Sequence, residues 1–348
     1  MQLALATYRL RFIHPFGTAH GLRDGTDAVF VRLARRGHTG YGEATLPPYL
    51  PYDQPSVHAD LTRFWRSHGA SIGERSDLPA AADDLLPPAR AALQMALMDL
   101  NAKEMGLSVE SLLIAGGRTV DNSRSMVTMG HTAVQDIDMK ISELPLTPVL
   151  KVKLGAANDR AVLEHLGQVH DRRFFLDANQ GWTSVAQAVE AVQVLGEERV
   201  VGLEQPFAKD RWDLHRALRN EVDVPVYADE SVQGLNELER AVEAFDGVNL
   251  KLMKCGGLDV ALAMAERAGN LGLKVMLGSM SESSLGCGAM LALRSHATLL
   301  DLDGPWLLAN DPFQGLRLED GLMAVDGRSG IGVGRRSGTV LDFTSIGA

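Results

Sequence analysis

The chain has 348 residues, more than one ordinary hydrophobic core holds, so two domains are expected. It is 45% hydrophobic and 22% charged, as soluble globular proteins are, and its net charge of −10 without a Lys/Arg-rich run argues against nucleic acid or an anionic membrane as a partner. The two cysteines, Cys255 and Cys287, are too few for a disulfide framework and lack the spacing of zinc ligands.

Residues 1–50 form three apolar/polar alternating runs separated by turns with Gly and Asp, which predicts strands. The first run, MQLALATYRLRF, lacks the basic segment and the sustained apolar core of a signal peptide. No run approaches the roughly 20 apolar residues of a membrane helix. We therefore expect a cytoplasmic protein.

Residues 56–115 have a helical period instead. The segment PPARAALQMALMDLNAKEMG begins with Pro87 and Pro88, contains good helix formers and stops at Gly106, which predicts one long helix. Three strands followed by helices predict a first α+β domain over residues 1–120.

From about residue 124, eight short apolar runs alternate with stretches of helical period, at a spacing near 25 residues. A doubly wound sheet and a closed barrel both fit this alternation, but eight strands in about 190 residues favour a barrel. After the last run, GPWLLANDPFQG carries no amphipathic helix and GLRLEDGLMAVDG predicts a hairpin. We therefore predict a modified (β/α)7β TIM barrel over residues 121–311 and an α+β capping domain in which residues 312–348 rejoin residues 1–120.

Charged residues stand at the carboxyl ends of successive predicted strands, where the active sites of such barrels form. They follow one another at intervals of 22 to 27 residues: Lys153, Asp177, Glu204, Asp229 and Lys251. Three carboxylates converging on one point repel each other, and each pKa would rise unless a cation neutralised them. An all-oxygen site of this kind suits Mg²⁺. The alternative is that these acids are ordinary strand-end charges or helix caps.

Lys153 and Lys251 lie four strands apart in a ring of eight, and therefore face each other. Two such lysines can serve as general acid and base on the two faces of one carbon, and burial, a neighbouring ammonium and the metal are expected to lower the lysine pKa. Lys151 shares the strand face of Lys153. It can bind a substrate carboxylate, or alternatively form a salt bridge to a metal-site carboxylate.

The motif series KxK, DxN, ExP, DES and KxxxxGG resembles the enolase superfamily, in its muconate-lactonizing-enzyme subgroup. The likeness extends to GYGEA near position 43 and to the helix ALQMALMDL. It implies that Lys153 and Lys251 are the acid/base pair and that Asp177, Glu204 and Asp229 hold Mg²⁺. Asn179 and Glu230, within the DxN and DES motifs, are expected to support these ligands, and Lys254 to be a loop charge.

Within that subgroup, DANQGW, NLKLMKCGG, GSMSESSLG and DLDGP resemble the dipeptide epimerases. The resemblance assigns Asp301 and Asp303, two carboxylates facing inward, to the ammonium group of a dipeptide. Alternatively, one of them, Asp301 rather than Asp303, bonds a neighbouring strand or loop. An acidic pair would repel N-acylamino acids and succinylbenzoate.

Side-chain specificity is expected from the capping domain, through the Gly-containing segment PFGTAHGLRDGT, interpreted as a loop that closes over the barrel mouth. Arg23 in this segment could pair with an acidic substrate side chain, as an arginine does in the Ala-Glu epimerases, or be a solvated charge. Thr128, Met280 and Ser281 are expected to line the pocket, with barrel packing as the alternative for Met280.

We therefore predict a Mg²⁺-dependent dipeptide epimerase that inverts the α-carbon of the C-terminal residue by two-base 1,1-proton transfer through a metal-stabilised enediolate. Its expected partner is a small-molecule dipeptide, and association into a homo-oligomer stays open. The first alternative is another enzyme of the superfamily: N-succinylamino acid racemase, o-succinylbenzoate synthase or muconate cycloisomerase. The others are a Schiff-base barrel enzyme with Lys251 as nucleophile and a catalytically silent barrel that binds a ligand.

Overall fold

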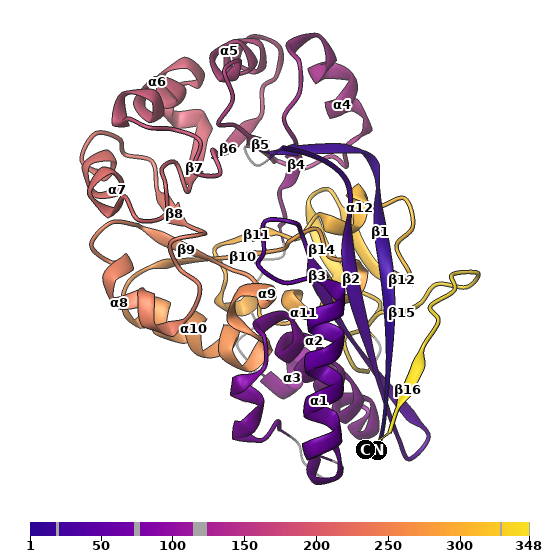
Figure 1. Ribbon diagram of the computed structural model, residues 1–348. Coiled ribbons are helices and arrows are strands. Elements are labelled where there is room, and N and C mark those ends of the chain that lie inside the picture. Colours follow the sequence, from indigo (N-terminus) through magenta and orange to yellow (C-terminus); the bar gives the residue numbers. More distant parts are fainter. Residues whose placement is uncertain (19–20, 73–76, 114–123, 328, 348) are drawn as a thin grey trace.

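The centre of the molecule is a barrel of eight parallel strands, seen in a computed structural model that describes residues 1–348 except 19–20, 73–76, 114–123, 328 and 348 (Figure 1). The strands pair in sequence order, and the ring closes where the N–H of Met126 donates to the carbonyl of Leu300 at 2.9 Å. The strands are β4 (Val127–Met129), β5 (Val149–Lys153), β6 (Arg173–Asp177), β7 (Val200–Glu204), β8 (Val226–Ala228), β9 (Gly247–Leu250), β10 (Lys274–Gly278) and β11 (Leu299–Asp301).

Helices surround the barrel on its outside (Figure 1). Their apolar positions recur with the helical period, as in α5, where Val162, Leu163 and Leu166 face the barrel and are buried. The helices of this layer are α4 (Ile137–Glu143), α5 (Asp159–Val169), α6 (Val185–Leu195), α7 (Trp212–Arg219), α8 (Leu238–Ala241), α10 (Leu258–Asn270) and α11 (Ser284–Leu291), with the short α9 (Leu252–Cys255) and α12 (Gly304–Leu307) directly after β9 and close after β11. Single 3₁₀ turns span Val134–Asp136, Glu197–Arg199, Leu235–Glu237 and Arg294–His296.

The cap is an antiparallel sheet covered by helices. Its strand order is β16 (Thr344–Ile346), β1 (Gln2–Thr18), β2 (Gly21–Arg35) and β3 (His38–Leu46). The helices are α1 (Gln54–Ile72), α2 (Pro87–Met105) and α3 (Val109–Leu113), with a 3₁₀ turn at Ala80–Asp84. Helix α2 packs so closely on β3 that a Cβ at Gly42 would lie 1.9 Å from the carbonyl oxygen of Ala92. Both ends of the chain lie together at this sheet (Figure 1).

The predicted fold class is confirmed: a (β/α)-type barrel carries a cap built from both ends of the chain. The hairpin predicted at GLRLEDGLMAVDG forms from β13 (Leu316–Glu319) and β14 (Leu322–Val325), beside the pair β12 (Phe313–Gln314) and β15 (Gly334–Arg335). The sheet gains a fourth strand, β16, that the alternation of residues 1–50 could not reveal. The predicted boundary at residue 120 lies outside the described residues, so the domain limits stay a prediction. Among the described helices none is long and apolar enough to cross a membrane.

Three contacts fasten the cap over the carboxyl ends of the barrel strands. Glu43 of β3 is fully buried and accepts the N–H groups of Ser283 and Gly286 at 2.9 and 3.0 Å, just after β10. Arg90 of α2 forms a two-pronged ion pair with Asp259 of α10. Gly17 of β1 accepts the N–H of His131, two residues after β4, at 2.9 Å. The segments that border the barrel mouth are therefore held from the cap side.

Candidate active site

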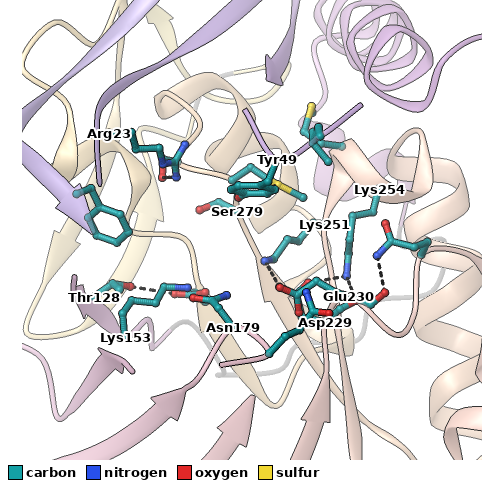
Figure 2. Close-up of a pocket in the computed structure, with 18 of the residues that line it drawn as sticks. Arg23, Tyr49, Thr128, Lys153, Asn179, Asp229, Glu230, Lys251, Lys254 and Ser279 are labelled. Carbon is teal, nitrogen blue, oxygen red and sulfur yellow. Dashed lines mark hydrogen bonds and ion pairs between the residues drawn. The ribbon is translucent and has the colours of Figure 1, made fainter. Parts of the chain in front are cut away.

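A cavity of about 450 Å³ lies between the cap and the carboxyl ends of the barrel strands. Most of the residues predicted from the sequence line it: Arg23, Thr128, Lys153, Asn179, Asp229, Glu230, Lys251, Met280, Ser281, Asp301 and Asp303. Lys153 and Lys251 enter from opposite sides (Figure 2), as expected for β5 and β9, four strands apart in the ring. The other three predicted residues, Lys151, Asp177 and Glu204, lie deeper and are at most 1% exposed.

Lys151 lies beneath the cavity among three carboxylates. Its Nζ is 2.6 Å from Glu204 Oε2, 2.6 Å from Asp301 Oδ2 and 3.2 Å from Asp177 Oδ2. Burial opposes the charged form, but these carboxylates outweigh it and raise the pKa of Lys151 well above its ordinary value. In this arrangement Lys151 is a buried cation that forms salt bridges to these carboxylates. This is the alternative to binding a substrate carboxylate.

Asp177 and Glu204 are neighbours across β6 and β7, and their environments push their pKa values apart. Burial would raise the pKa of Asp177, but Lys153, whose Nζ is 2.5 Å from Asp177 Oδ2, and Lys151 lower it to about 2. Burial and the adjacent Asp177 raise the pKa of Glu204 to about 8. Negative charge is therefore crowded at the ends of these two strands.

Asp229, directly after β8, lies between two lysines. Lys251 contacts Oδ2 at 2.6 Å and Lys254 contacts Oδ1 at 2.8 Å (Figure 2). Burial alone would lower the pKa of Lys251, but Asp229 and Glu204 outweigh it and raise the pKa. In this arrangement the carboxylates stabilise the Lys251 ammonium more than burial penalises it, and the lowered lysine pKa expected from the sequence beside a bound metal stays a prediction.

The position of Lys254 corrects the expectation that it is a loop charge. It lies in α9, is buried, and donates from Nζ to Asp229 Oδ1 and to the carbonyls of Asp229, Val232 and Asn249 at 2.8 to 3.1 Å. The helical turn that follows Lys251 places Lys254 next to Asp229, at the end of β8. The motif KLMKCGG contains both lysines, but only the fold shows where the second one lies.

Two further residues of the site were missed from the sequence. Asn249 donates from Nδ2 to Glu204 Oε1 at 2.7 Å. It stands two residues before Lys251, so strand alternation could have placed it on the inner face. Gln205, with φ +36°, accepts the N–H groups of Asp229 and Ser231, both at 3.0 Å, and thereby fixes the DES segment.

His215 of α7 packs beneath this network in its neutral form. It is fully buried between Phe207 and Phe245; Nδ1 donates to the carbonyl of Arg211 at 2.8 Å, and Nε2 accepts from Gln205 Nε2 at 3.3 Å. Burial lowers its pKa from 6.5 to about 4. A folded-state pKa below the unfolded one means that protons favour the unfolded chain.

We expect the contribution of His215 to stability to be complete above about pH 6.5 and lost as the pH falls towards 4, by about 3 kcal/mol. Urea unfolding of wild type and His215→Gln at pH 7, 5.5 and 4.5 measures it. The variant should lose this part of the acid sensitivity, whereas His38→Gln, which changes an exposed histidine, should keep it. If the free energy of unfolding fell equally with pH in all three proteins, the lowered pKa would not belong to His215.

The two aspartates assigned to a substrate ammonium have partners in the structure. Asp301 binds Lys151 and, at 3.4 Å, the hydroxyl of Thr128; Asp303 Oδ2 accepts the N–H of Thr128 at 2.5 Å. Burial and the adjacent Asp301 raise the pKa of Asp303 to about 7. They are therefore not two free carboxylates. Asp301 makes the cross-strand contact that was the alternative, and both still line the cavity.

Arg23 belongs to a strand rather than to the mobile loop expected from the sequence. β1 continues to Thr18 and β2 begins at Gly21. Within this pair of strands, Arg23 lies opposite Phe16. Its guanidinium lies 5.1 Å from the Phe12 ring centre and 5.7 Å from that of Tyr49, with Nη2 3.4 Å from Ser281 Oγ. Among the described residues its buried Nε and Nη1 have no hydrogen-bond partner, and burial lowers its pKa. A solvated loop charge is thus excluded.

Met280 and Ser281 follow β10 and line the same cavity. The Sδ atom of Met280 lies 3.4 Å from the hydroxyl of Tyr49, and Ser281 has φ +68°. Asn179, with φ +43°, donates its N–H to Asp177 Oδ1 at 2.9 Å, and its buried side-chain oxygen has no hydrogen-bond partner among the described residues. Strained backbone at two positions of one cavity is typical of a functional site.

The donor chemistry of this site fits a hard divalent cation. Asp177, Glu204 and Asp229 offer only carboxylate oxygens, which Mg²⁺ prefers, and the raised pKa of Glu204 reflects negative charge that a cation would neutralise. The carboxylates lie against lysine ammonium groups, and within the described part of the chain no three His, Cys, Asp or Glu side chains are already arranged as a metal site. A metal-holding role of these acids stays a prediction.

The resemblance inferred from the motifs is confirmed by comparison with known proteins. Residues 120–336 match the model of the enolase C-terminal domain-like family, and the chain belongs to this family. The L-Ala-D/L-Glu epimerase of Bacteroides thetaiotaomicron is 34% identical over 337 residues, which covers 96% of this chain and 88% of that protein.

Solved structures share the fold. The dipeptide epimerase from Methylococcus capsulatus, complexed with Mg and the dipeptide L-Arg-D-Lys, has a TM-score of 0.78 and 30% identity, and the match covers 96% of this chain and 99% of that one. The dipeptide epimerase from Cytophaga hutchinsonii, complexed with Mg and D-Ala-L-Val, has a TM-score of 0.89 and 23% identity, with 100% and 99% covered. At the lower identity the likeness concerns the fold alone.

Proposed function

We propose that this protein is a Mg²⁺-dependent dipeptide epimerase that inverts the α-carbon of the C-terminal residue. The observation that carries the proposal is the pair Lys153 and Lys251, which reach one cavity from opposite sides next to three buried carboxylates. An enzyme that inverts a carbon needs a base on one face and an acid on the other. The relatives named as dipeptide epimerases support the substrate class.

Asp177, Glu204 and Asp229 are the residues that would hold Mg²⁺. When bound, Mg²⁺ would supply positive charge that makes the α-proton of the substrate more acidic, and Asp229, as one of the residues that hold it, would then stabilise the Lys251 ammonium less. The neutral amine of one lysine takes the α-proton, and the electron pair left on the carbon delocalises into the carboxylate. The ammonium of the other lysine then returns a proton to the opposite face.

The remaining cavity residues would orient the dipeptide. Asp303, together with Asp301, lies where the free ammonium of the first residue is expected, and Thr128 fixes both carboxylates. Arg23 lines the same cavity, and its buried Nε and Nη1 have no hydrogen-bond partner among the described residues, which favours an acidic side chain on the second residue. An L-Ala-L-Glu-like dipeptide would use both ends of the cavity.

The proposal predicts deuterium incorporation that depends on Mg²⁺. Incubation with dipeptides in D₂O should place deuterium at the α-carbon of the C-terminal residue, detected by mass spectrometry, and EDTA should stop it until Mg²⁺ is restored. Exchange only with N-succinyl amino acids would instead favour the racemase alternative. Exchange indifferent to EDTA, with borohydride trapping of a carbonyl substrate, would indicate Schiff-base chemistry at Lys251.

Replacing Arg23 should change specificity more than catalysis in general. For Arg23→Gln we expect kcat/KM for L-Ala-L-Glu to fall about 10- to 100-fold, since a charged hydrogen bond is lost, while L-Ala-L-Leu changes little. Arg66→Gln, on the exposed face of α1, is the matched control. A parallel fall for both dipeptides would contradict a role of Arg23 in reading the side chain.

A further inference from the structure

A second cavity, of about 310 Å³, adjoins the first. The two share Phe16, Thr128 and Leu307 as walls. Its lining residues come mainly from β1, β4, α4 and α12, and α12 packs against β1 (Figure 1). The contact from His131 N–H to Gly17 O holds the end of β1 beside the segment that follows β4. We name it the Trp306 cavity, after the largest side chain that lines it.

Thr128, one of the three residues shared by the two cavities, also orients Asp301 and Asp303. Thr128 donates its N–H to Asp303 and its hydroxyl to Asp301. On the proposed function, on which this inference rests, these aspartates take the ammonium group of the dipeptide. The side chain of that first residue is attached to the carbon that carries the ammonium, so it leaves the site beside Thr128. The opening next to Thr128 is the Trp306 cavity.

The chemistry of the Trp306 cavity selects an apolar group. Ile13, Met129, Leu144 and Trp306 are among the apolar side chains that line it, and Ile13 remains 55% exposed although it is a large apolar side chain. Lys140 at its edge donates to the carbonyl of His131 at 3.4 Å, and the two other charged residues are paired with each other: His14 Nε2 lies 2.8 Å from Glu143 Oε2. A charged substrate group entering here would therefore lose water without finding an unpaired partner in that pair.

We propose that the Trp306 cavity binds the side chain of the substrate's first residue, and that this enzyme prefers dipeptides whose first residue is large and apolar, such as leucine or phenylalanine. A methyl group would leave most of the cavity unfilled. Each methylene that an apolar pocket takes up is worth about 10-fold or more in kcat/KM. The preference is therefore a property of the first residue, independent of the contact that Arg23 makes to the second.

The test compares kcat/KM for L-Leu-L-Glu and L-Ala-L-Glu by deuterium incorporation. In wild type we expect the ratio to exceed about 10. Leu144→Trp, which fills the cavity from its far wall, should lower the ratio about 10-fold, and Ile13→Glu, which puts a charge at an exposed position of the rim, should lower it as well. Leu146→Trp, two residues away and 65% exposed, is the control and should keep the wild-type ratio.

Thermal unfolding of each variant shows that it is folded before the ratio is compared. A wild-type ratio near 1, or a ratio that neither Leu144→Trp nor Ile13→Glu lowers, overturns the assignment of the Trp306 cavity while the epimerase function stands. If no dipeptide of the series exchanges deuterium, the proposed function itself fails and the side-chain site fails with it. A fall of the ratio in both variants but not in Leu146→Trp supports the proposal.

Discussion

Lys251→Gln is expected to abolish epimerisation, with a fall in kcat of about 10²- to 10⁴-fold, and Lys153→Gln should do the same. Because the two lysines approach the cavity from opposite sides, each variant loses proton transfer on one face only. Each should therefore still exchange deuterium into one epimer of the dipeptide, and the two variants should act on opposite epimers. Proton NMR in D₂O with both epimers measures this.

The matched control for both lysines is Lys209→Gln, an exposed lysine at the edge of the same cavity, which should keep exchange with both epimers. Circular dichroism of the variants shows whether they are folded, since removing Lys251 takes a buried partner from Asp229. Exchange of both epimers by Lys251→Gln, or loss of the same epimer in both variants, would contradict the two-base arrangement.

Lys254→Met is expected to lower the free energy of unfolding by about 3–5 kcal/mol, although Lys254 transfers no proton in the proposed reaction. The change leaves Asp229 Oδ1 and three buried backbone carbonyls without the donor that joins the ends of β8 and β9. Urea unfolding of the apoprotein measures the loss.

The control for this prediction is Lys274→Met, at the exposed start of β10, which should stay within about 0.5 kcal/mol of wild type. A value for Lys254→Met within about 1 kcal/mol of wild type would show that the carbonyls and Asp229 find water or other donors, and would remove Lys254 from the structural core of the site.

The barrel and the positions of its charged residues could be predicted because both depend on local patterns. Each of these apolar strand patterns is followed by a charged residue at its carboxyl end, and parallel strands bring these ends to one edge of the ring. This is why Lys153, Asp177 and Glu204 end β5, β6 and β7, while Asp229 and Lys251 directly follow β8 and β9. The helical part of the cap could also be predicted from the sequence, because helix α2 has strong start and stop signals.

The environments of these residues could not be predicted, because they depend on partners far away in sequence. Lys151 and Lys153 look equivalent in the sequence because they lie on one strand. In the structure Lys151 is buried and donates a hydrogen bond to Asp301, 150 residues later in the chain. The buried position of Lys254 depends on the single helical turn that follows Lys251. Arg23 looked like part of a loop because its segment is rich in glycine, but its pairing with Phe16 extends the sheet to the barrel mouth.

The joining of β16 to β1 has a consequence for synthesis of the chain. On the ribosome the barrel strands are complete once Asp301 has emerged, but the outer edge of β1 stays unpaired until Thr344 arrives opposite Leu5. An open edge of this kind can capture a strand from a neighbouring chain. The nascent protein therefore passes through an interval in which all barrel strands have been made while the sheet that covers them still has an edge able to pair with the wrong partner.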